Sequence, residues 1–309
     1  MTVHTVVGAG GAIGNRLVPI LLEQNEDVRL VSRSGRPVAG AEVISSDATD
    51  LDAMKRAIKG SSVVYLLVGL PYDIRVWRTQ WPTIMSNVIE ACKEASARLL
   101  FLDNVYMYGR AGGTMTEETP FRPVSQKGEV RAAIAEELLD DMRAGRIDGL
   151  IARSADFYGP GAERTSVPHL LVIANLARGR KAQWPCNADM PHSLTYAPDA
   201  ARALSLLAQR DDAFGQTWHL PTSSNPLTGR QFASAAAAAM GRPDGVVQLP
   251  RWMIRVGGLF SRAVKESVEM AYQYEAPYVF DSSKFNQAFG YTPVAYADGV
   301  VHTVESLRD

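Results

Sequence analysis

The 309-residue chain has only two cysteines, Cys92 and Cys186, which stand far apart in the sequence. Neither belongs to a C-x-x-C pair, and no cluster of histidines and cysteines has the spacing of metal ligands. We therefore predict two reduced, inert thiols and no metal site.

The chain also lacks a charge bias and long apolar runs. Its net charge is −1, from 32 basic and 33 acidic side chains, which leaves no electrostatic signal for nucleic acid or an anionic membrane. No apolar run reaches about 18 residues, and the N-terminus enters a strand without the basic region and apolar core of a leader. We expect a cytoplasmic protein that binds a small-molecule substrate, with no nucleic acid and no membrane as partner.

A glycine-rich turn near the N-terminus is the most informative feature that is present. Residues 3–16 read VHTVVGAGGAIGNR, an apolar strand pattern, three spaced glycines and the start of a helical pattern. Gly8 allows the tight turn, Gly11 lets the main chain approach a diphosphate, and Gly14 lets the helix pack close against the sheet. Free amides at the helix start then meet the negative charge. This predicts a dinucleotide site rather than a structural turn, formed by Gly8, Gly11, Ala12, Ile13 and Gly14.

Strand and helix patterns alternate along the first half of the chain. Strands are expected at 27–31, 41–46, 62–68, 98–102 and 149–152, and helices at 50–59, 74–95 and 126–143. Apolar strands that alternate with helices predict an α/β fold, a Rossmann-type doubly wound parallel sheet covered by helices on both faces.

Glycines and prolines break the chain into shorter pieces beyond residue 157, which predicts a smaller C-terminal α/β substrate lobe. A helix at 198–207 and a strand at 216–220 are expected to return to the main sheet. The predicted dinucleotide-binding domain is therefore 1–156 with 195–222, and the substrate-binding lobe is 157–194 with 223–309.

The end of the second expected strand indicates which dinucleotide binds. Sites that prefer NAD carry an acid there, whereas this chain has Ser32 and Arg33, which can bind a 2′-phosphate. NADP(H) is therefore favoured, although Arg33 could also be a solvated loop residue. Asp47 could accept a hydrogen bond from the adenine amino group or cap the next helix, a role that Thr49 or Asp50 fits better. The further cofactor-binding residues that we expect are Ala48 beside Asp47, and Val68 and Gly69, which should border the nicotinamide ribose.

Several ordered motifs extend along nearly the whole chain. They are GAGGAIG at 8–14, NVYMYG at 104–109, RSADFYGPG at 153–161, HSLTYAPDAARAL at 192–204 and FDSSKFNQAFGYTP at 280–293. Together with Asp47, they resemble the extended short-chain dehydrogenases/reductases, also called the NAD-dependent epimerase/dehydratase family. The resemblance implies an NAD(P)-dependent enzyme, and a homodimer could form through two long helices.

The chain departs from this family at all three of its usual catalytic positions. The family carries a Tyr-x-x-x-Lys pair and a hydroxyl after the fifth strand, whereas here Lys127, Arg131 and Asn104 stand at those positions. Lys127 and Arg131 are both expected to contact the cofactor. Arg131 can still anchor a ribose hydroxyl, but its guanidinium cannot shuttle a proton. Lys127 could act as an acid or base if burial and the nearby Arg131 favour its neutral form, and Tyr106 is the second candidate. The alternatives are a solvent-facing Lys127 and a Tyr106 packed beneath the substrate lobe.

These residues predict an NADP(H)-dependent oxidoreductase that moves a hydride between nicotinamide and a carbonyl, imine or conjugated alkene. The proton would come from Lys127, Tyr106 or water, and the Asn104 amide could polarise the reacting oxygen. Two alternatives stay open at this point. One is a non-catalytic NADP(H)-sensing regulator, and the other is a sugar-nucleotide epimerase or dehydratase that uses bound cofactor without net redox change.

Overall fold

The computed structural model describes residues 2–163 and 166–308. The chain divides into two compact units of nearly equal length, unit 1 (1–107, 127–153 and 200–218) and unit 2 (108–126, 154–199 and 219–309). The second unit is therefore not the smaller lobe that the broken pattern suggested. Residues 108–126 also belong to it rather than to the first domain, because Met115 forms a β-bridge with Phe280 and Glu117 accepts a hydrogen bond from the His219 amide.

Unit 1 contains a seven-stranded sheet. Its strands are β1 (Val3–Val7), β2 (Asp27–Ser32), β3 (Ala41–Ser45), β4 (Val63–Leu66), β5 (Arg98–Asp103), β6 (Gly149–Arg153) and β10 (Thr217–His219), in the order β10-β6-β5-β4-β1-β2-β3. The pairs among β1 to β6 are parallel. The order reverses between β1 and β4, which is the topological switch point where such sheets bind ligands. The doubly wound fold predicted from the sequence is confirmed.

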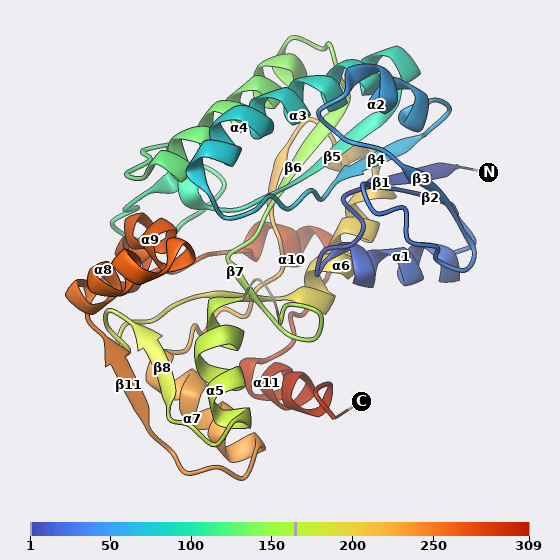
Figure 1. Cartoon of the computed structure of the whole chain (residues 1–309). Coiled ribbons are helices and arrows are strands. Elements are labelled where there is room, and N and C mark those ends of the chain that lie inside the picture. The colour runs from blue at the N-terminus through green and yellow to red at the C-terminus, as the bar shows by residue number, and fades with distance from the viewer. Residues whose placement is uncertain (1, 164–165, 309) are drawn as a thin grey trace. The chain divides into compact units, whose positions relative to one another are not determined.

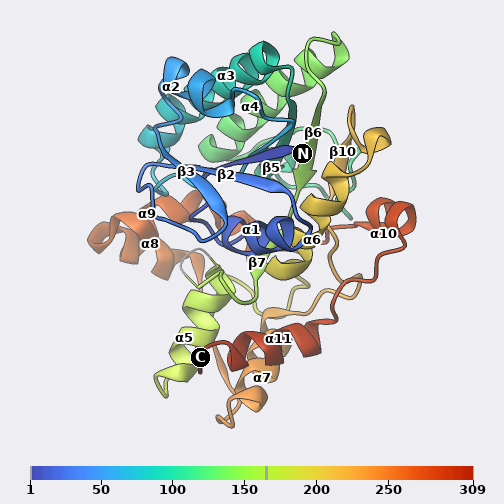
Figure 2. The same ribbon diagram turned by 90° about the vertical axis from the view of Figure 1, so that its right-hand side faces the viewer.

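Helices cover both faces of this sheet, as Figures 1 and 2 show. One face carries α1 (Gly14–Glu23) and α6 (Ala197–Ala208), and the other carries α2 (Leu51–Ile58), α3 (Ile74–Ala95) and α4 (Gln126–Arg143). Every residue of β4 and β6 is consequently buried, which is why these strands read as unbroken apolar runs in the sequence. Within the described ranges, no helix combines the length and apolarity needed to cross a membrane.

Unit 2 is built from shorter elements around an aromatic core. Two parallel strand pairs join β7 (Asp156–Tyr158) to β9 (Leu194–Tyr196), and β8 (Ala182–Pro185) to β11 (Val246–Leu249). Its helices are α5 (Ala174–Ala177), α7 (Gly229–Ala239), α8 (Arg251–Phe260), α9 (Arg262–Ser267), α10 (Ser283–Phe289) and α11 (Tyr296–Glu305). Tyr158, Trp184 and Phe232 are almost wholly buried, and Phe232 contacts Tyr158 edge-on and Trp184 in a tilted arrangement, so large rings fill this core.

A polar cluster is buried beside this aromatic core. The Nε2 atom of His192 lies 3.1 Å from Oδ2 of Asp156, and the Tyr274 hydroxyl donates to the same oxygen at 2.7 Å. The His192 ring is stacked on Tyr274 at 4.5 Å and on Tyr278 at 5.5 Å. Burial raises the pKa of Asp156, but the hydrogen bonds from His192 and Tyr274 outweigh it and leave the pKa below its ordinary value of 3.8. The ionised form of Asp156 is therefore part of what stabilises unit 2.

This linkage predicts how the Asp156→Asn variant behaves with pH. A carboxyl whose pKa is lowered by folding stabilises the folded state above its ordinary pKa, and this contribution is lost as the pH falls through the lower folded-state value. At about pH 7 we expect the substitution to reduce the free energy of unfolding by roughly 1.5–3 kcal/mol, the range for hydrogen bonds to a charged group. The difference from the native protein should shrink below about pH 4 in urea denaturation.

The matched control is Asp189→Asn, which removes an exposed carboxylate that pairs with Arg230. We expect little change in stability from this substitution at either pH, because solvent screens exposed ion pairs. A destabilisation by Asp156→Asn that stays constant across the pH range would show that the ionisation of Asp156 contributes nothing.

Candidate functional site

The turn between β1 and α1 depends on glycine at position 8. Gly8 has a φ of +92°, which side chains rarely adopt, and its amide donates to the Val31 carbonyl at 2.9 Å. A Cβ atom at this position would lie only 2.6 Å from the backbone nitrogen of Val68. The turn is therefore tight, as the sequence predicted, and it lies directly against the chain that leaves β4.

Gly14 also lies in close contact with the backbone. A Cβ on Gly14 would lie 2.4 Å from the carbonyl oxygen of Ala9, so the first helical turn packs closely on the β1–α1 turn. The reason is geometric, because Gly14 is the first residue of α1 and the chain has only just turned over it.

The other side of the same turn is open. A Cβ on Gly10 would meet no atom of the described chain within 4 Å, and one on Gly11 would meet only the Gly8 carbonyl oxygen, at 3.8 Å. No side chain caps α1 at Ile13, and the Asn15 and Arg16 amides of its first turn donate to the backbone carbonyls of Gly11 and Ile13, at 3.1 and 3.0 Å. An open backbone beside an uncapped helix start fits the diphosphate of a dinucleotide.

A guanidinium and hydroxyl groups lie where β2 ends. Ser32 is the last residue of β2 and its Oγ accepts from the Gly35 amide at 3.3 Å, while Arg33 is exposed. Hydrogen bonds from the Thr49 amide and hydroxyl, at 2.9 and 2.8 Å, lower the pKa of Asp47, and the charge of Arg33 adds to the effect. Asp47 therefore shapes its own loop and lies in the field of Arg33.

The cap of α2 is Asp50, one of the two residues that the sequence favoured for that role over Asp47. Its carboxylate accepts from the Ala53 amide at 2.9 Å. Because the helix is capped by Asp50, the carboxylate of Asp47 remains at the edge of the sheet beside Thr49.

In the turn after β5, both the backbone amide and the side-chain oxygen of Asn104 form hydrogen bonds. The Asn104 amide donates to Oδ1 of Asp103 at 2.8 Å, and its side-chain oxygen accepts from the Tyr106 amide at 3.0 Å. The carboxamide is thereby fixed with its oxygen occupied, and its nitrogen is the end that can donate to another molecule.

Asp103 is part of a buried charged cluster that the sequence analysis missed. Its Oδ1 accepts from Nε of Arg131 at 2.7 Å and also from Nη2, which in addition donates to the Leu102 carbonyl at 3.4 Å. Nε of Arg153 lies 3.6 Å from the other carboxylate oxygen, and all three charged residues are at most 3% exposed.

Arg131 is further enclosed by aromatic rings. Its guanidinium lies 4.4 Å from the centre of the Trp81 ring and 4.9 Å from that of Phe101. Arg131 is therefore fixed in the core next to the turn after β5, with two of its nitrogens bound to Asp103 and Leu102.

Lys127 is fully buried, so the alternative of a solvent-facing helix lysine is wrong. Its Nζ lies 4.5 Å from the centre of the Tyr72 ring. Tyr72 contacts Trp77 edge-on at 5.7 Å, and Trp77 stacks on Tyr106 at 6.3 Å. A continuous chain of ring contacts therefore connects the two proposed proton donors, and Tyr106 packs on α3 of its own unit.

Tyr72 and Trp77 were not among the site residues predicted from the sequence. The available signal was the stretch GLPYDIRVW directly after the fourth strand, because residues at the carboxyl ends of parallel strands meet at one edge of the sheet. The indole nitrogen of Trp77 donates to the Pro71 carbonyl at 3.0 Å, which holds this segment against α3.

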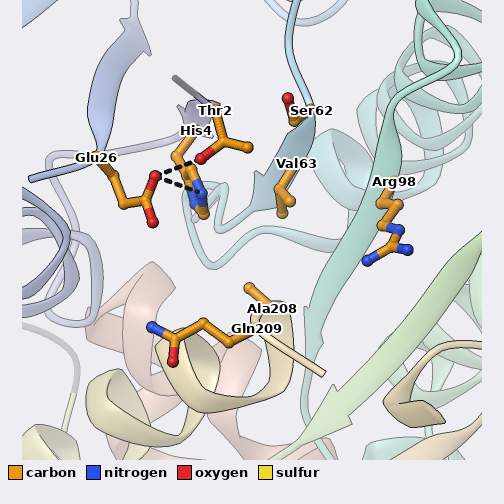
Figure 3. Close-up of a pocket in the computed structure, with 8 residues that line it drawn as sticks. All are labelled: Thr2, His4, Glu26, Ser62, Val63, Arg98, Ala208 and Gln209. Carbon is orange, nitrogen blue, oxygen red and sulfur yellow. Dashed lines mark hydrogen bonds and ion pairs between the residues drawn. The ribbon is translucent and has the colours of Figure 1, made fainter. Parts of the chain in front are cut away.

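A cavity of about 350 Å³ lies at the opposite edge of the same sheet. Figure 3 shows Thr2, His4 and Val63 lining it, from the beginnings of β1 and β4, and the carboxylate of Glu26 faces His4 with 3.5 Å between Oε2 and Nε2. Because parallel strands begin at the same edge, this cavity is remote from the glycine turn and belongs to no part of the candidate site. Within residues 2–163 and 166–308, no group of three His, Cys, Asp or Glu side chains could hold a metal ion.

Solved structures share the fold of the whole chain. MoeE5 in complex with UDP-glucose and NAD is 23% identical, with a TM-score of 0.79 over 100% of this chain and 99% of that one. DesIV, a dTDP-glucose 4,6-dehydratase from Streptomyces venezuelae with NAD and TYD bound, is 18% identical, with a TM-score of 0.80 over 99% and 97% of the two chains. At these identities the likeness establishes the fold alone.

One curated relative is similar in sequence. A dTDP-6-deoxy-L-talose 4-dehydrogenase (NAD(P)(+)) from Kitasatospora kifunensis is 28% identical over 193 residues, or 58% of this chain. The match spans 60% of that enzyme's length.

The family comparison covers the glycine turn and all the strands of unit 1. The NAD dependent epimerase/dehydratase family matches residues 4–220, well over half of the chain. This confirms the resemblance that the ordered motifs indicated. The chain belongs to the NAD dependent epimerase/dehydratase family.

Proposed function

We propose that the protein is an NADP(H)-dependent oxidoreductase that transfers a hydride between nicotinamide and a carbonyl, imine or conjugated alkene of a small molecule. The observation that carries the proposal is the burial of Lys127, with its Nζ against the face of Tyr72, at the position where we expect the family's tyrosine. An ionisable amine that is buried near the ligand-binding edge of the sheet favours a role in catalysis over that of a solvated surface charge.

The residues of unit 1 supply a complete set of cofactor contacts under this proposal. The amides at the start of α1, around Gly11 and Gly14, would hold the diphosphate, since the backbone at Gly10 and Gly11 is open and no side chain caps the helix. The remaining contacts would come from Gly8, Ala12 and Ile13 in the turn, from Ser32 and Arg33 for the 2′-phosphate, from Asp47 and Ala48 for the adenine, and from Val68 and Gly69 for the nicotinamide ribose.

The protein's own part in the chemistry is to orient the substrate and to move one proton. NADPH, when bound, supplies the hydride. Lys127 donates a proton from Nζ to the substrate oxygen, so that a carbonyl becomes an alcohol, and the neutral amine then recovers a proton from water. The Asn104 nitrogen donates a hydrogen bond to the same oxygen, because the Tyr106 amide holds the carboxamide in that orientation. The Tyr106 hydroxyl is the alternative proton donor.

We propose a role for Arg131 that differs from the expected binding of a ribose hydroxyl. Because Nε and Nη2 are bound to Asp103 and Leu102, only Nη1 is left to reach a ribose hydroxyl. We infer that Arg131 acts mainly by holding Asp103, which in turn accepts from the Asn104 amide. It is a positioning residue for the β5 turn.

A sugar-nucleotide substrate is the second candidate, and the comparisons favour it. The curated relative is named as a dehydrogenase of a dTDP-sugar, and MoeE5 was solved with UDP-glucose. An enzyme that reduces a keto group of a nucleotide sugar with NADPH would be consistent with the proposed oxidoreductase and with a sugar-nucleotide substrate. Turnover of such a substrate without net consumption of NADPH would instead indicate an epimerase or dehydratase.

We expect Arg33→Ala to weaken the binding of NADPH by roughly 10- to 100-fold while the binding of NADH changes little. The physical reason is the loss of charge-assisted hydrogen bonds to the 2′-phosphate, each of which contributes roughly 1.5–3 kcal/mol. Isothermal titration calorimetry with both coenzymes measures this, and Arg36→Ala is the control because Arg36 is also exposed in the same loop. Equal losses for NADPH and NADH would refute the assignment of Arg33.

Lys127→Met tests the proton donor, because it keeps the length of a buried side chain but removes its proton. With any substrate found in a panel of carbonyls, enones and keto nucleotide sugars, we expect kcat to fall by about 10²- to 10⁴-fold. The dissociation constant for NADPH should change only a few-fold, and a thermal melt checks that the variant folds.

The matched variant is Tyr106→Phe, which removes only a hydroxyl. A loss of kcat in Tyr106→Phe with near-normal turnover in Lys127→Met would reverse the two assignments. Tight binding of NADPH with no turnover across the panel would overturn the oxidoreductase and support a regulator that senses the coenzyme.

A further inference from the structure

Helix α8 in unit 2 exposes an apolar face that no other described helix matches in its exposed side chains. The five side chains, with their exposed fractions, are Trp252 at 64%, Met253 at 42%, Val256 at 48%, Leu259 at 81% and Phe260 at 86%. Residues at spacings of three, four and seven lie on one side of a helix, so these side chains form a continuous stripe. A stripe that includes two large aromatic rings marks a docking surface rather than scattered exposure.

The packing of α8 on α9 does not use this stripe. Figure 1 shows the two helices side by side, and their close approach is made at two glycines of α8. A Cβ on Gly258 would lie 3.0 Å from the Cα of Lys265, and one on Gly257 would lie 3.3 Å from Cγ1 of Val264. The hairpin is therefore closed by small residues on one side, while its large apolar side chains point elsewhere.

Positive charge surrounds the stripe. Residues 251–265 contain four cationic side chains and no acidic one, in a chain whose total charge is −1. Arg251 pairs with Glu275, and the side chains of Arg255, Arg262 and Lys265 are exposed. The two acids that follow, at positions 266 and 269, are only partly exposed. An apolar face with tryptophan and phenylalanine, bordered by cations, is the pattern of a helix that lies in a membrane interface.

A second copy of the chain fits this surface less well. In a symmetric dimer the same patch meets itself, which would bring the cations of both hairpins together without acidic partners in residues 251–265. The two helices, of 10 and 6 residues, also supply fewer than the roughly 20–30 residues a side of a stable interface. An anionic bilayer would attract the cations, and a small apolar patch is sufficient for peripheral binding to it.

We propose that the α8–α9 hairpin docks the protein on an anionic lipid surface. The side chains of Trp252, Leu259 and Phe260 enter the boundary between headgroups and acyl chains, and Arg255 and Lys265 contact lipid phosphates. The attachment is peripheral and reversible, since one short helix buries few side chains. It is independent of the proposed reaction.

The test uses the full chain and vesicles of phosphatidylcholine with and without phosphatidylglycerol. We expect the protein to sediment with the anionic vesicles and to be released by salt, because screening weakens the contribution of the cations. Replacing Leu259 and Phe260 together by Glu should weaken this binding by at least about 100-fold, given the apolar area that each buries. Val301→Glu, at a side chain 42% exposed on α11, is the control and should bind as the native protein does.

A second pair of variants tests the charges without altering the apolar stripe. Replacing Arg255 and Lys265 by Gln should weaken binding to the anionic vesicles by about 10- to 30-fold. Arg178→Gln, which removes an exposed arginine outside the hairpin, should have no effect. Absence of binding to anionic vesicles at low salt would overturn the proposal. So would a concentration-dependent dimer that the Leu259 and Phe260 substitutions abolish, because that result would identify a second copy as the occupant.

Discussion

The close approach of two backbones at the switch point of the sheet is the constraint on which the rest of unit 1 depends. Gly8 turns the chain off β1 with a positive φ, and a side chain there would collide with the backbone at Val68. The two segments meet because β1 and β4 are neighbours at the place where the strand order reverses. The open backbone at Gly10 and Gly11 and the absence of a side-chain cap on α1 belong to the same turn, and they are the features on which the proposed diphosphate site rests.

Arg131, Asp103 and Asn104 form one connected hydrogen-bonded arrangement in unit 1. Arg131 is bound to Asp103, Asp103 accepts from the Asn104 amide, and the carboxamide of Asn104 is oriented by the next turn of chain. A guanidinium can hold a buried carboxylate with several directed donors, which an ammonium does less well. Lys127 lies one helical turn before Arg131 on α4, with its Nζ over the Tyr72 ring.

Total charge and local charge give different information about this molecule. The chain is nearly neutral, which argued against an anionic partner, yet residues 251–265 carry four cations and no acid. Such a segment can contact another molecule only if its apolar side chains are exposed, and the sequence alone does not distinguish exposed side chains of α8 from side chains buried in a core. The structure leaves Leu259 and Phe260 more than four-fifths exposed.

The sequence by itself determined the order and type of the elements in unit 1, because strand and helix periodicity and glycine turns are local properties. It predicted Ile74–Ala95 and Gln126–Arg143 as helices with the bounds that α3 and α4 have. Only the tertiary structure decided that Lys127 is buried against Tyr72, that Arg131 pairs with Asp103, and that 108–126 joins the second unit. Each of these facts is a contact between segments distant along the chain, and such contacts leave no periodic trace in the sequence.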